Sequence, residues 1–384
     1  MTPPARKVKV IQVLECGGSG GTGQSVTALC RAMDPGRFEV LLAYNIRPGN
    51  RPDTYEAGFP PGVRKIRVPE MVRPIRPLED LTALWKLYRL FREERPDAVH
   101  AHSSKAGFLA RLAALAAGVP RIFYSPLCYS FRMADAPRLS RALYLLAEAL
   151  VSRIGHIVVQ GPAEVPIARR LAGPGRVLPF FSGVEVERLR PEAAPPGAGP
   201  SGGGPPPLTI VTCGRVSAQK NPEAFVRLCA ALAPRFPSAR FVWVGGGESA
   251  PSQALLDYAR SLGLEDRFRM TGWLPAEAAL LELRRADLVV HFSSWDVAPF
   301  AVLEAMALGK AVVGSPAADT VVHGETGYVA GNERRLQEYA GLLLGSPALR
   351  GRMGSAARRT VERDYSFSRL VRQLESAYEA GVAG

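Results

Sequence analysis

Short apolar runs alternate with amphipathic helical segments in both halves of the chain, and this alternation limits the possible folds more than any other feature. Apolar side chains recur at helical spacing between the runs, as in the segment 78–92. Strand-like runs are expected at residues 8–14, 38–43, 98–101, 121–125, 156–160, 208–213, 240–244, 288–292 and 311–314. Strands that alternate with helices are typical of parallel sheets covered on both faces. We therefore predict an α/β fold with two Rossmann-like, doubly wound parallel sheets.

A segment made almost entirely of Pro, Gly, Ala and Ser, PEAAPPGAGPSGGGPPP at residues 191–207, divides the chain into nearly equal halves. This composition is typical of a linker or an exposed loop. We expect an N-terminal domain at 1–190, the linker at 191–207, a C-terminal domain at 208–365 and a terminal helix at 366–384. Whether that helix crosses back to the N-terminal domain is left open. Two such domains form a cleft, and ligands bind beyond the carboxyl ends of the strands.

The composition excludes several classes of protein. Hydrophobic residues make up 47% of the sequence, too many for a mainly disordered chain. The most apolar stretches are interrupted by Arg111 and Glu148, so no membrane-spanning helix is expected. The N-terminus lacks the pattern of a signal peptide, and the five cysteines are scattered without a C-x-x-C pair, as in a protein with reduced thiols. We expect a cytoplasmic protein without structural zinc.

The positive charge is concentrated in the first half of the chain. The net charge is +13, and residues 1–190 carry 28 Lys and Arg against 16 Asp and Glu. A basic half suits an anionic ligand, an anionic membrane surface or nucleic acid. No groove-reading motif or aromatic single-strand platform is present, so we expect no nucleic-acid partner. Peripheral contact with the inner face of a membrane stays open, through a basic cluster formed by Arg64, Lys65, Arg67, Arg73 and Arg76.

A glycine loop, GGSGGTG at residues 17–23, follows the first strand. It satisfies G-x-G-x-x-G, but the second strand ends at Asn45 without the acidic residue that a dinucleotide ribose needs. No Lys-Ser/Thr pair follows, so the loop is not a P-loop either. Two interpretations remain: a tight turn, or contact of the glycine backbone with a phosphorylated or sugar ligand.

Candidate binding residues follow two strands of the second half. Arg215 and Lys220 come after the strand at 208–213, and two cations at this position suit a diphosphate. Asp296 follows the strand at 288–292, and Pro299 is expected to be the first residue of the next helix. The amides of Phe300 and Ala301 would then face a ligand at the positive end of the helix dipole.

Glu304 lies one turn into that helix, among apolar neighbours. A carboxylate in such surroundings needs a partner. Ribose hydroxyls would serve, and so would a structural arginine.

With these motifs in place, the sequence resembles the family 4 glycosyltransferases, which are retaining enzymes of the GT-B fold. In the first half the resemblance rests on DAVHAHSSKAG at 97–107 and FYSP at 123–126, which are similar to the branch that builds bacterial surface polysaccharides. In the second half it rests on GRVSAQK at 214–220, GGG at 245–247, TGW at 271–273, the acid-x7-Glu segment 296–304 and GETGY at 324–328.

The resemblance implies a role for each candidate. Arg215 and Lys220 would hold the donor diphosphate, Glu304 the ribose, and the Phe300 and Ala301 amides a phosphate. Asp296 would face the donor sugar as the catalytic carboxylate. The remaining contacts would come from the Trp273–Leu274 backbone at the nucleobase, from Gly20 and Gly21 at the donor, and from His102 at a substrate. No metal or other cofactor would be required.

The sequence departs from the family pattern at three places. Asp296 replaces the usual Glu, Leu127 stands where many relatives have His, and Asp319-Thr320 replaces Pro-Glu. The expected function is transfer of a sugar from a nucleoside diphosphate, with UDP as the expected nucleotide, to a lipid-linked or soluble hydroxyl acceptor. Surface polysaccharide and secondary-metabolite biosynthesis both fit. A non-catalytic subunit that binds nucleotide sugars and a GT-B sugar-nucleotide epimerase are the alternatives.

Overall fold

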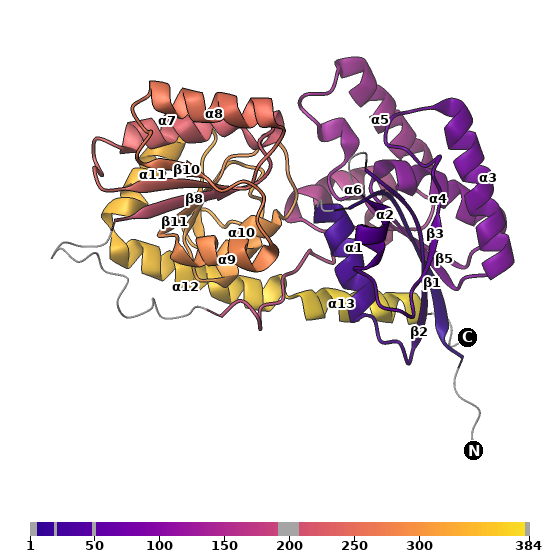
Figure 1. Cartoon of the computed structure of the whole chain (residues 1–384). Helices are drawn as coiled ribbons and strands as arrows, with labels where there is room; N and C mark the ends of the chain where they lie inside the picture. The colour runs from indigo at the N-terminus through magenta and orange to yellow at the C-terminus, as the bar shows by residue number, and fades with distance from the viewer. Residues whose placement is uncertain (1–5, 19–20, 48–50, 191–206, 381–384) are drawn as a thin grey trace. The chain divides into compact units, whose positions relative to one another are not determined.

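The computed structural model describes residues 6–18, 21–47, 51–190 and 207–380, and the chain forms two compact units (Figure 1). Unit 1 comprises Met1–Phe181 and Ser368–Gly384, and unit 2 comprises Ser182–Phe367. The division therefore falls a few residues before the expected boundary at 190. Apart from Pro207, the expected linker 191–207 lies outside the described residues.

Unit 1 is built on a seven-stranded parallel sheet in the order β3-β2-β1-β4-β5-β6-β7. Its strands are β1 (Val8–Gly17), β2 (Phe38–Ile46), β3 (Arg64–Arg67), β4 (Ala98–His102), β5 (Arg121–Ser125), β6 (His156–Val158) and β7 (Val177–Leu178). Its helices are α1 (Gly21–Ala32), α2 (Pro52–Glu56), α3 (Pro77–Glu94), α4 (Ser104–Ala117), α5 (Arg138–Val151), α6 (Val165–Ala172) and α13 (Phe367–Glu379), which begins at the boundary with unit 2.

Unit 2 repeats the plan with a six-stranded parallel sheet in the order β10-β9-β8-β11-β12-β13. Its strands are β8 (Thr209–Cys213), β9 (Arg240–Val244), β10 (Phe268–Met270), β11 (Leu288–His291), β12 (Val312–Gly314) and β13 (Gly327–Val329). Its helices are α7 (Pro222–Leu232), α8 (Ser249–Ser261), α9 (Ala276–Arg285), α10 (Phe300–Ala307), α11 (Glu333–Gly345) and α12 (Pro347–Asp364). The predicted pair of doubly wound parallel sheets is confirmed.

In both sheets the first strand in sequence lies near the middle, and the order reverses beside it. In unit 2 the chain moves outward from β8 to β9 and β10, and then returns to place β11 on the other side of β8. The loops after β8 and β11 therefore diverge at a topological switch point, where ligands of doubly wound sheets bind. The central strands are apolar because helices cover both faces of a parallel sheet.

The C-terminal helix α13 packs on unit 1 through polar contacts. The Tyr378 hydroxyl lies 2.5 Å from Nδ1 of His100, and Glu375 Oε1 accepts a hydrogen bond of 2.9 Å from the amide of Asp34. Glu375 also pairs with Arg37 at 3.0 Å. The end of the chain therefore completes the N-terminal unit.

The two charged residues that interrupt the apolar stretches of the sequence form a buried ion pair. Arg111 on α4 is fully buried, and its Nη2 donates to Glu148 Oε2 on α5 at 2.9 Å. The Tyr124 hydroxyl donates to the other carboxylate oxygen at 2.5 Å, and the Arg111 guanidinium lies 3.9 Å from the centre of the Tyr124 ring. The arginine also donates to the carbonyls of Gly107 and Val151. This network attaches α5 to the helix layer.

We expect Glu148→Ala to lower the free energy of unfolding of unit 1 by about 3–5 kcal/mol, because it leaves the Arg111 charge buried without its partner. Glu93→Ala is the matched control. It breaks the exposed pair between Arg89 and Glu93 and should cost under about 1 kcal/mol. Urea unfolding of both variants measures the difference, and equal losses would contradict a structural role for the buried pair.

Candidate functional site

Most of the predicted binding residues gather at the switch point of unit 2. Arg215 and Lys220 follow β8, and Asp296 and the start of α10 follow β11. Arg215 is exposed, while Lys220 is partly buried in the short helical turn Ala218–Lys220. The two segments come from neighbouring strands and are far apart in the sequence.

Three bonds join these two loops. The Ser294 amide donates to the Gln219 carbonyl at 2.8 Å, and Gln219 Nε2 donates to the Trp295 carbonyl at 2.8 Å. Lys220 Nζ donates to Asp296 Oδ2 at 2.5 Å. The main-chain contacts hold the register of the loops, so that the lysine and the carboxylate meet.

Asp296 is held in its charged form. Burial raises the pKa of this carboxyl, but hydrogen bonding to His291 and the charge of Lys220 outweigh burial and keep it below its ordinary value. His291 Nε2 lies 3.3 Å from Asp296 Oδ2. Burial, followed by the Lys220 charge, lowers the pKa of His291 itself. The site therefore contains an anionic carboxylate between a lysine and a neutral imidazole.

This pairing was not anticipated from the sequence, where Lys220 is expected to contact the diphosphate and Asp296 the donor sugar. In the structure each has the other as its partner. A ligand diphosphate would have to compete with Asp296 for the lysine.

Glycines bring the strand ends close together beside the lysine. Gly245 has a φ of +125°, and a Cβ at this position would lie 2.2 Å from the Gly214 carbonyl oxygen. The alkyl chain of Lys220 lies over Gly214, 3.2 Å from where a side chain would begin. A larger residue at Gly245 would push the main chain of Gly214 away, and a larger residue at Gly214 would displace the Lys220 side chain.

The predicted nucleobase segment reaches the same edge of the sheet. Gly272 pairs with Gly245 through an isolated antiparallel bridge, which places Trp273 beside the glycine turn that follows β9. Trp273 is 66% exposed. A large aromatic side chain that stays exposed after the edge strand β10 is available to a ligand.

Helix α10 begins at Phe300, with Pro299 as its N-cap, so the expectation that Pro299 is the first helical residue is wrong by one position. Proline offers no side-chain oxygen to its helix, and the start of α10 has no side-chain cap within the described residues. The preceding loop is held by Asp319 Oδ1, which accepts a hydrogen bond of 2.8 Å from the Ala298 amide. The Phe300 and Ala301 amides therefore lie at the positive end of a helix beside Asp296.

Glu304 lies one turn into α10, half-buried, and no hydrogen bond or ion pair of its side chain is found in the described part of the chain. Burial raises its pKa to about 7. Burial and then the charge of Glu304 raise the pKa of the Cys213 thiol at the end of β8. The structural arginine considered from the sequence is therefore not there, and the side chain is suited to hydroxyl donors from a ligand.

The predicted residues of unit 1 have different surroundings. Gly20 lies outside the described residues, and Gly21 is the first residue of α1. A Cβ at Gly23 would lie 2.5 Å from the Gly18 carbonyl oxygen, so the main chain at Gly18 and the first turn of α1 approach each other closely. His102 is buried with its Nε2 2.7 Å from Gln12 Oε1, and burial lowers its pKa to about 3. This ring is therefore neutral and already hydrogen-bonded.

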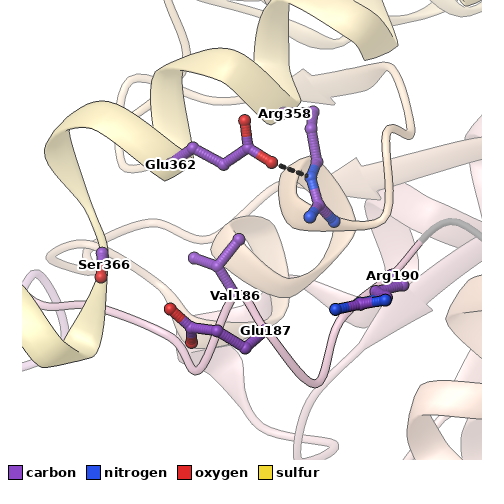
Figure 2. A pocket seen from close by; sticks show the side chains of 6 residues that line it. All are labelled: Val186, Glu187, Arg190, Arg358, Glu362 and Ser366. Atoms are coloured by element: carbon purple, nitrogen blue, oxygen red, sulfur yellow. Dashed lines mark hydrogen bonds and ion pairs between the residues drawn. The ribbon is translucent and has the colours of Figure 1, made fainter.

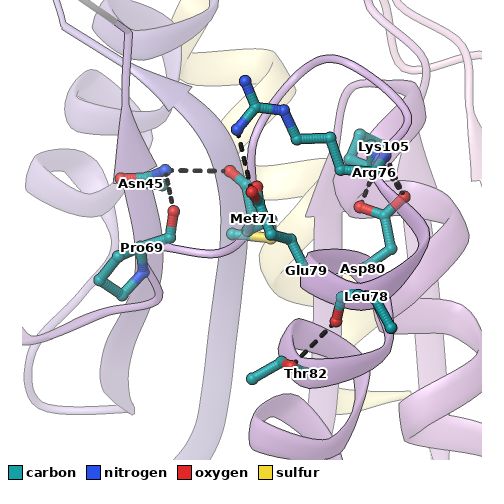
Figure 3. Close-up of polar contacts among 9 residues, drawn as sticks. All are labelled: Asn45, Pro69, Met71, Arg76, Leu78, Glu79, Asp80, Thr82 and Lys105. Carbon is teal, nitrogen blue, oxygen red and sulfur yellow. Dashed lines mark hydrogen bonds and ion pairs between the residues drawn. The ribbon is translucent and has the colours of Figure 1, made fainter.

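Asn45 closes β2 where a dinucleotide site would need an acid. Its amide nitrogen donates to the carbonyls of Pro69 and Met71 at 2.9 and 3.1 Å (Figure 3). The side chain fixes the following turn and is not free to hold a ribose.

Sequence reasoning missed His291, Gln219 and the role of Asp319. His291 could have been found, because it is the polar residue that closes an apolar strand at the ligand-binding edge. The contacts of Gln219 and Asp319 depend on loop conformation and have no sequence signal.

A pocket in unit 2 contains none of the predicted residues. One of its two arginines, Arg358, donates from Nε to Glu362 Oε1 at 2.6 Å (Figure 2). The pocket is lined by Val186, Glu187, Arg190, Arg358, Glu362 and Ser366. Within the described ranges, no group of three or more His, Cys, Asp or Glu side chains is arranged to hold a metal ion.

Two family models match the chain. Residues 20–180 match the glycosyl transferase 4-like domain, and residues 203–360 match the glycosyl transferases group 1. A D-inositol 3-phosphate glycosyltransferase from Actinosynnema mirum is 30% identical over 73% of this chain and 72% of its own length. The chain belongs to the family 4 glycosyltransferases.

Other relatives match over shorter stretches. The UDP-Gal:alpha-D-GlcNAc-diphosphoundecaprenol alpha-1,3-galactosyltransferase of Escherichia coli is 27% identical over 56% of each chain. The alpha-D-kanosaminyltransferase of Streptomyces kanamyceticus is 29% identical over 44% of this chain and 45% of its own length. The aligned part spans about half the length of these curated relatives.

Solved structures establish the fold. The sucrose-phosphate synthase of Thermosynechococcus elongatus matches with a TM-score of 0.80 at 18% identity, over 98% of this chain and all of that one. Anabaena HepE, solved with UDP and glucose, matches with a TM-score of 0.75 at 17% identity, over 97% of this chain and all of that one. Together with the two parallel sheets, these matches identify the GT-B fold.

The unpaired, half-buried Glu304 predicts a pH-dependent stability. Its raised pKa means that the protonated side chain is favoured in the folded state, so stability falls as the pH rises from about 4.5 through about 7. We expect Glu304→Gln to raise the free energy of unfolding at pH 8 by on the order of 1–3 kcal/mol, and by much less at pH 5. Thermal unfolding at the two pH values measures this.

Glu265→Gln, at an exposed position, is the control. Its effect on the free energy of unfolding should be the same at pH 5 and pH 8. If Glu304→Gln gave the same small change at pH 5 and pH 8, the carboxyl would have a partner that stabilises its charge.

Proposed function

We propose that this protein is a retaining glycosyltransferase that moves a sugar from a nucleoside diphosphate donor, with UDP as the nucleotide, to a hydroxyl acceptor. The observation that carries the proposal is the cluster at the switch point of unit 2. There a lysine and an anionic aspartate lie on the loops after β8 and β11, followed by the start of α10 and Glu304, for which the described residues provide no side-chain cap and no side-chain partner. Family membership supports the reaction class.

Each part of the donor has a chemically matched group. The two phosphates suit Arg215, Lys220 and the amides of Phe300 and Ala301, because guanidinium, ammonium and helix-terminal N–H groups all favour anions. The ribose hydroxyls suit Glu304, whose carboxyl is half-buried and has no partner within the described residues. The nucleobase suits the exposed Trp273 and the adjoining Leu274. We expect donor binding to lower the pKa of Glu304, because hydrogen bonds from the ribose stabilise its charge.

The donor diphosphate would replace Asp296 as the partner of Lys220. When a diphosphate arrives, the ammonium group would turn to it, because the ligand brings more negative charge than one carboxylate. Asp296 would keep its contact with His291, 3.3 Å away, and would face the donor sugar. Asp296 is one methylene shorter than the family's usual Glu, and His291 keeps the shorter side chain oriented.

In the reaction, the bond between the anomeric carbon and the diphosphate oxygen breaks as the acceptor oxygen bonds to the same face of that carbon. The acceptor proton passes to the departing diphosphate, and negative charge builds on the diphosphate. Arg215, Lys220 and the start of α10 oppose this charge, so the step needs no metal ion. The negative charge of Asp296 favours positive charge on the sugar carbon.

The acceptor is proposed to be lipid-linked, in surface polysaccharide biosynthesis on the inner face of a membrane. The name of the Escherichia coli relative includes a diphosphoundecaprenol acceptor, and the basic half of this chain suits an anionic surface. Within the described residues no helix is long and apolar enough to cross a membrane. A soluble acceptor in secondary metabolism is the competing possibility, which the similarity to an aminosugar transferase favours.

The departures from the family pattern at Leu127 and Asp296 favour a second function, that of a non-catalytic subunit that binds nucleotide sugars. Leu127 replaces a histidine found in many relatives, and Leu127 and Cys128 both adopt positive φ angles, +53° and +83°. Such a subunit would bind UDP-sugars without turnover. A GT-B sugar-nucleotide epimerase would instead return a UDP-sugar with one stereocentre inverted, without an acceptor and without net release of UDP.

The main test is Lys220→Ala. Loss of one positive charge that faces the developing charge should lower turnover about 10²–10³-fold, and donor affinity should fall as well. Release of UDP from a panel of UDP-sugars, with and without acceptor, measures both, and NMR of the product reports whether the anomeric configuration is retained.

Arg334→Ala is the control, since it removes a cation that is 88% exposed and paired within α11. Undiminished turnover and affinity in Lys220→Ala would refute the diphosphate role. An inverted product would refute the retaining mechanism.

A further inference from the structure

Helix α5 exposes its leucines instead of burying them. Only Glu148 and Val151 are buried in this helix, and Glu148 is used to reach Arg111. The side chains at spacings of four, three and four residues lie on one stripe. They are between 49% and 73% exposed: Leu139, Leu143, Leu146 and Leu150. A helix of a folded unit normally turns such a stripe toward the core.

A second exposed apolar row starts just before α3 and continues along its first turns. It consists of Ile75, Leu78, Leu81 and Trp85, which are between 54% and 83% exposed. Helices α3 and α5 flank α4 on the same side of the sheet in unit 1 (Figure 1). The segment before α3 also contacts the loop before α5, where Arg73 Nη2 lies 3.6 Å from Met133 Sδ. We call the surface formed by the two rows the α3–α5 face.

Arginines outnumber the acids that lack an ion pair around the α3–α5 face. Arg138 and Arg141 have no ion pair with a carboxylate within the described residues, and Arg73 acts electrostatically on the buried Glu15. The exposed acid nearby is Asp135, in the loop before α5. The only acid of α5, Glu148, is buried in its ion pair.

The acids at the start of α3 are neutralised as well. Glu79 pairs with Arg76 at 2.9 Å, and Asp80 pairs with Lys105 at 2.5 Å (Figure 3). The face therefore combines exposed apolar side chains with an excess of arginines over acids that lack an ion pair.

We propose that the α3–α5 face docks on an anionic lipid bilayer, with the leucines at the boundary between headgroups and acyl chains and the arginines at the phosphates. Leucines beside arginines on an exposed helix are typical of interfacial helices, and Trp85 suits the headgroup region. Each arginine near an anionic surface adds to the attraction. A second copy of the chain fits the charges less well, because it would bring unpaired arginines against each other.

This face differs from the basic cluster considered from the sequence. Two members of that cluster are already paired in the structure, Arg64 with Glu94 and Arg76 with Glu79. Arg73 is the member that belongs to the α3–α5 face. The inference rests on the proposed function in one respect: docking would bring the protein to a lipid-linked acceptor. Docking itself is measured without any sugar.

The test compares sedimentation of the whole protein with phosphatidylcholine vesicles that contain or lack phosphatidylglycerol. We expect binding only to the anionic vesicles, and weaker binding at high salt, where the attraction is screened. Leu143→Glu with Leu146→Glu should lower the vesicle affinity at least about tenfold, since two half-exposed leucines no longer enter the bilayer. Arg138→Gln should give a smaller loss and a weaker dependence on salt.

Leu281→Glu with Leu342→Glu is the matched control. It adds the same charge at similarly exposed leucines of unit 2 and should leave vesicle binding unchanged. Thermal unfolding and UDP affinity are measured for every variant, so that loss of docking is told apart from misfolding and from failure of the donor site.

Absence of wild-type binding to anionic vesicles would overturn the inference. A wild-type dimer that the Leu143→Glu, Leu146→Glu variant converts to a monomer would also overturn it, in favour of a second copy on this face.

Discussion

The ion pair between Lys220 and Asp296 is the interaction on which the account of the site depends. It joins the loops that follow β8 and β11, the two strands at which the order of the sheet reverses. The parallel arrangement of the sheet places these loops side by side, and the bonds of Gln219 hold them in register. Two groups of opposite charge, 76 positions apart in the sequence, are thereby kept 2.5 Å apart. The ammonium group of Lys220 is therefore partly buried beside a carboxylate that neutralises it.

The surrounding groups differ in charge state in a way that suits a nucleotide sugar. Asp296 stays ionised because Lys220 and His291 oppose the effect of burial, whereas the pKa of Glu304 is raised to about 7 because only burial acts on it. One carboxylate is therefore already charged, and the other is only partly charged near neutral pH. In unit 1 the histidines on β4, His100 and His102, are buried and neutral. The exposed arginines and leucines of unit 1 lie elsewhere, on α3, α5 and the segments before them.

Much of the fold could be predicted from the sequence, and the reasons for the failures are physical. Central strands such as β1, β8 and β11 are continuous apolar runs, which are easy to recognise. The edge strands β3, β7, β10 and β13 have only two to four residues, and β3 reads Arg-Lys-Ile-Arg, so they form because a neighbouring strand offers hydrogen bonds.

The candidate site was only partly predictable. Arg215, Lys220, Asp296 and Glu304 stood out as polar residues after strands or inside an apolar helix. Their pairing could not be predicted, because it depends on loop conformation. The same holds for α5, whose leucines have the pattern of a buried stripe, although its neighbours leave that stripe exposed. Arg111 and Glu148 were visible as interruptions, but not as partners.

The most direct measurement is the calorimetric affinity of UDP for Asp296→Asn compared with the wild type and Lys220→Ala. If the diphosphate competes with Asp296 for Lys220, removing the carboxylate charge should leave UDP binding as tight or tighter, whereas removing the lysine should weaken it. If Asp296→Asn and Lys220→Ala weakened UDP binding equally, the ion pair would be a structural bond that must stay intact, and the account of the site would be contradicted.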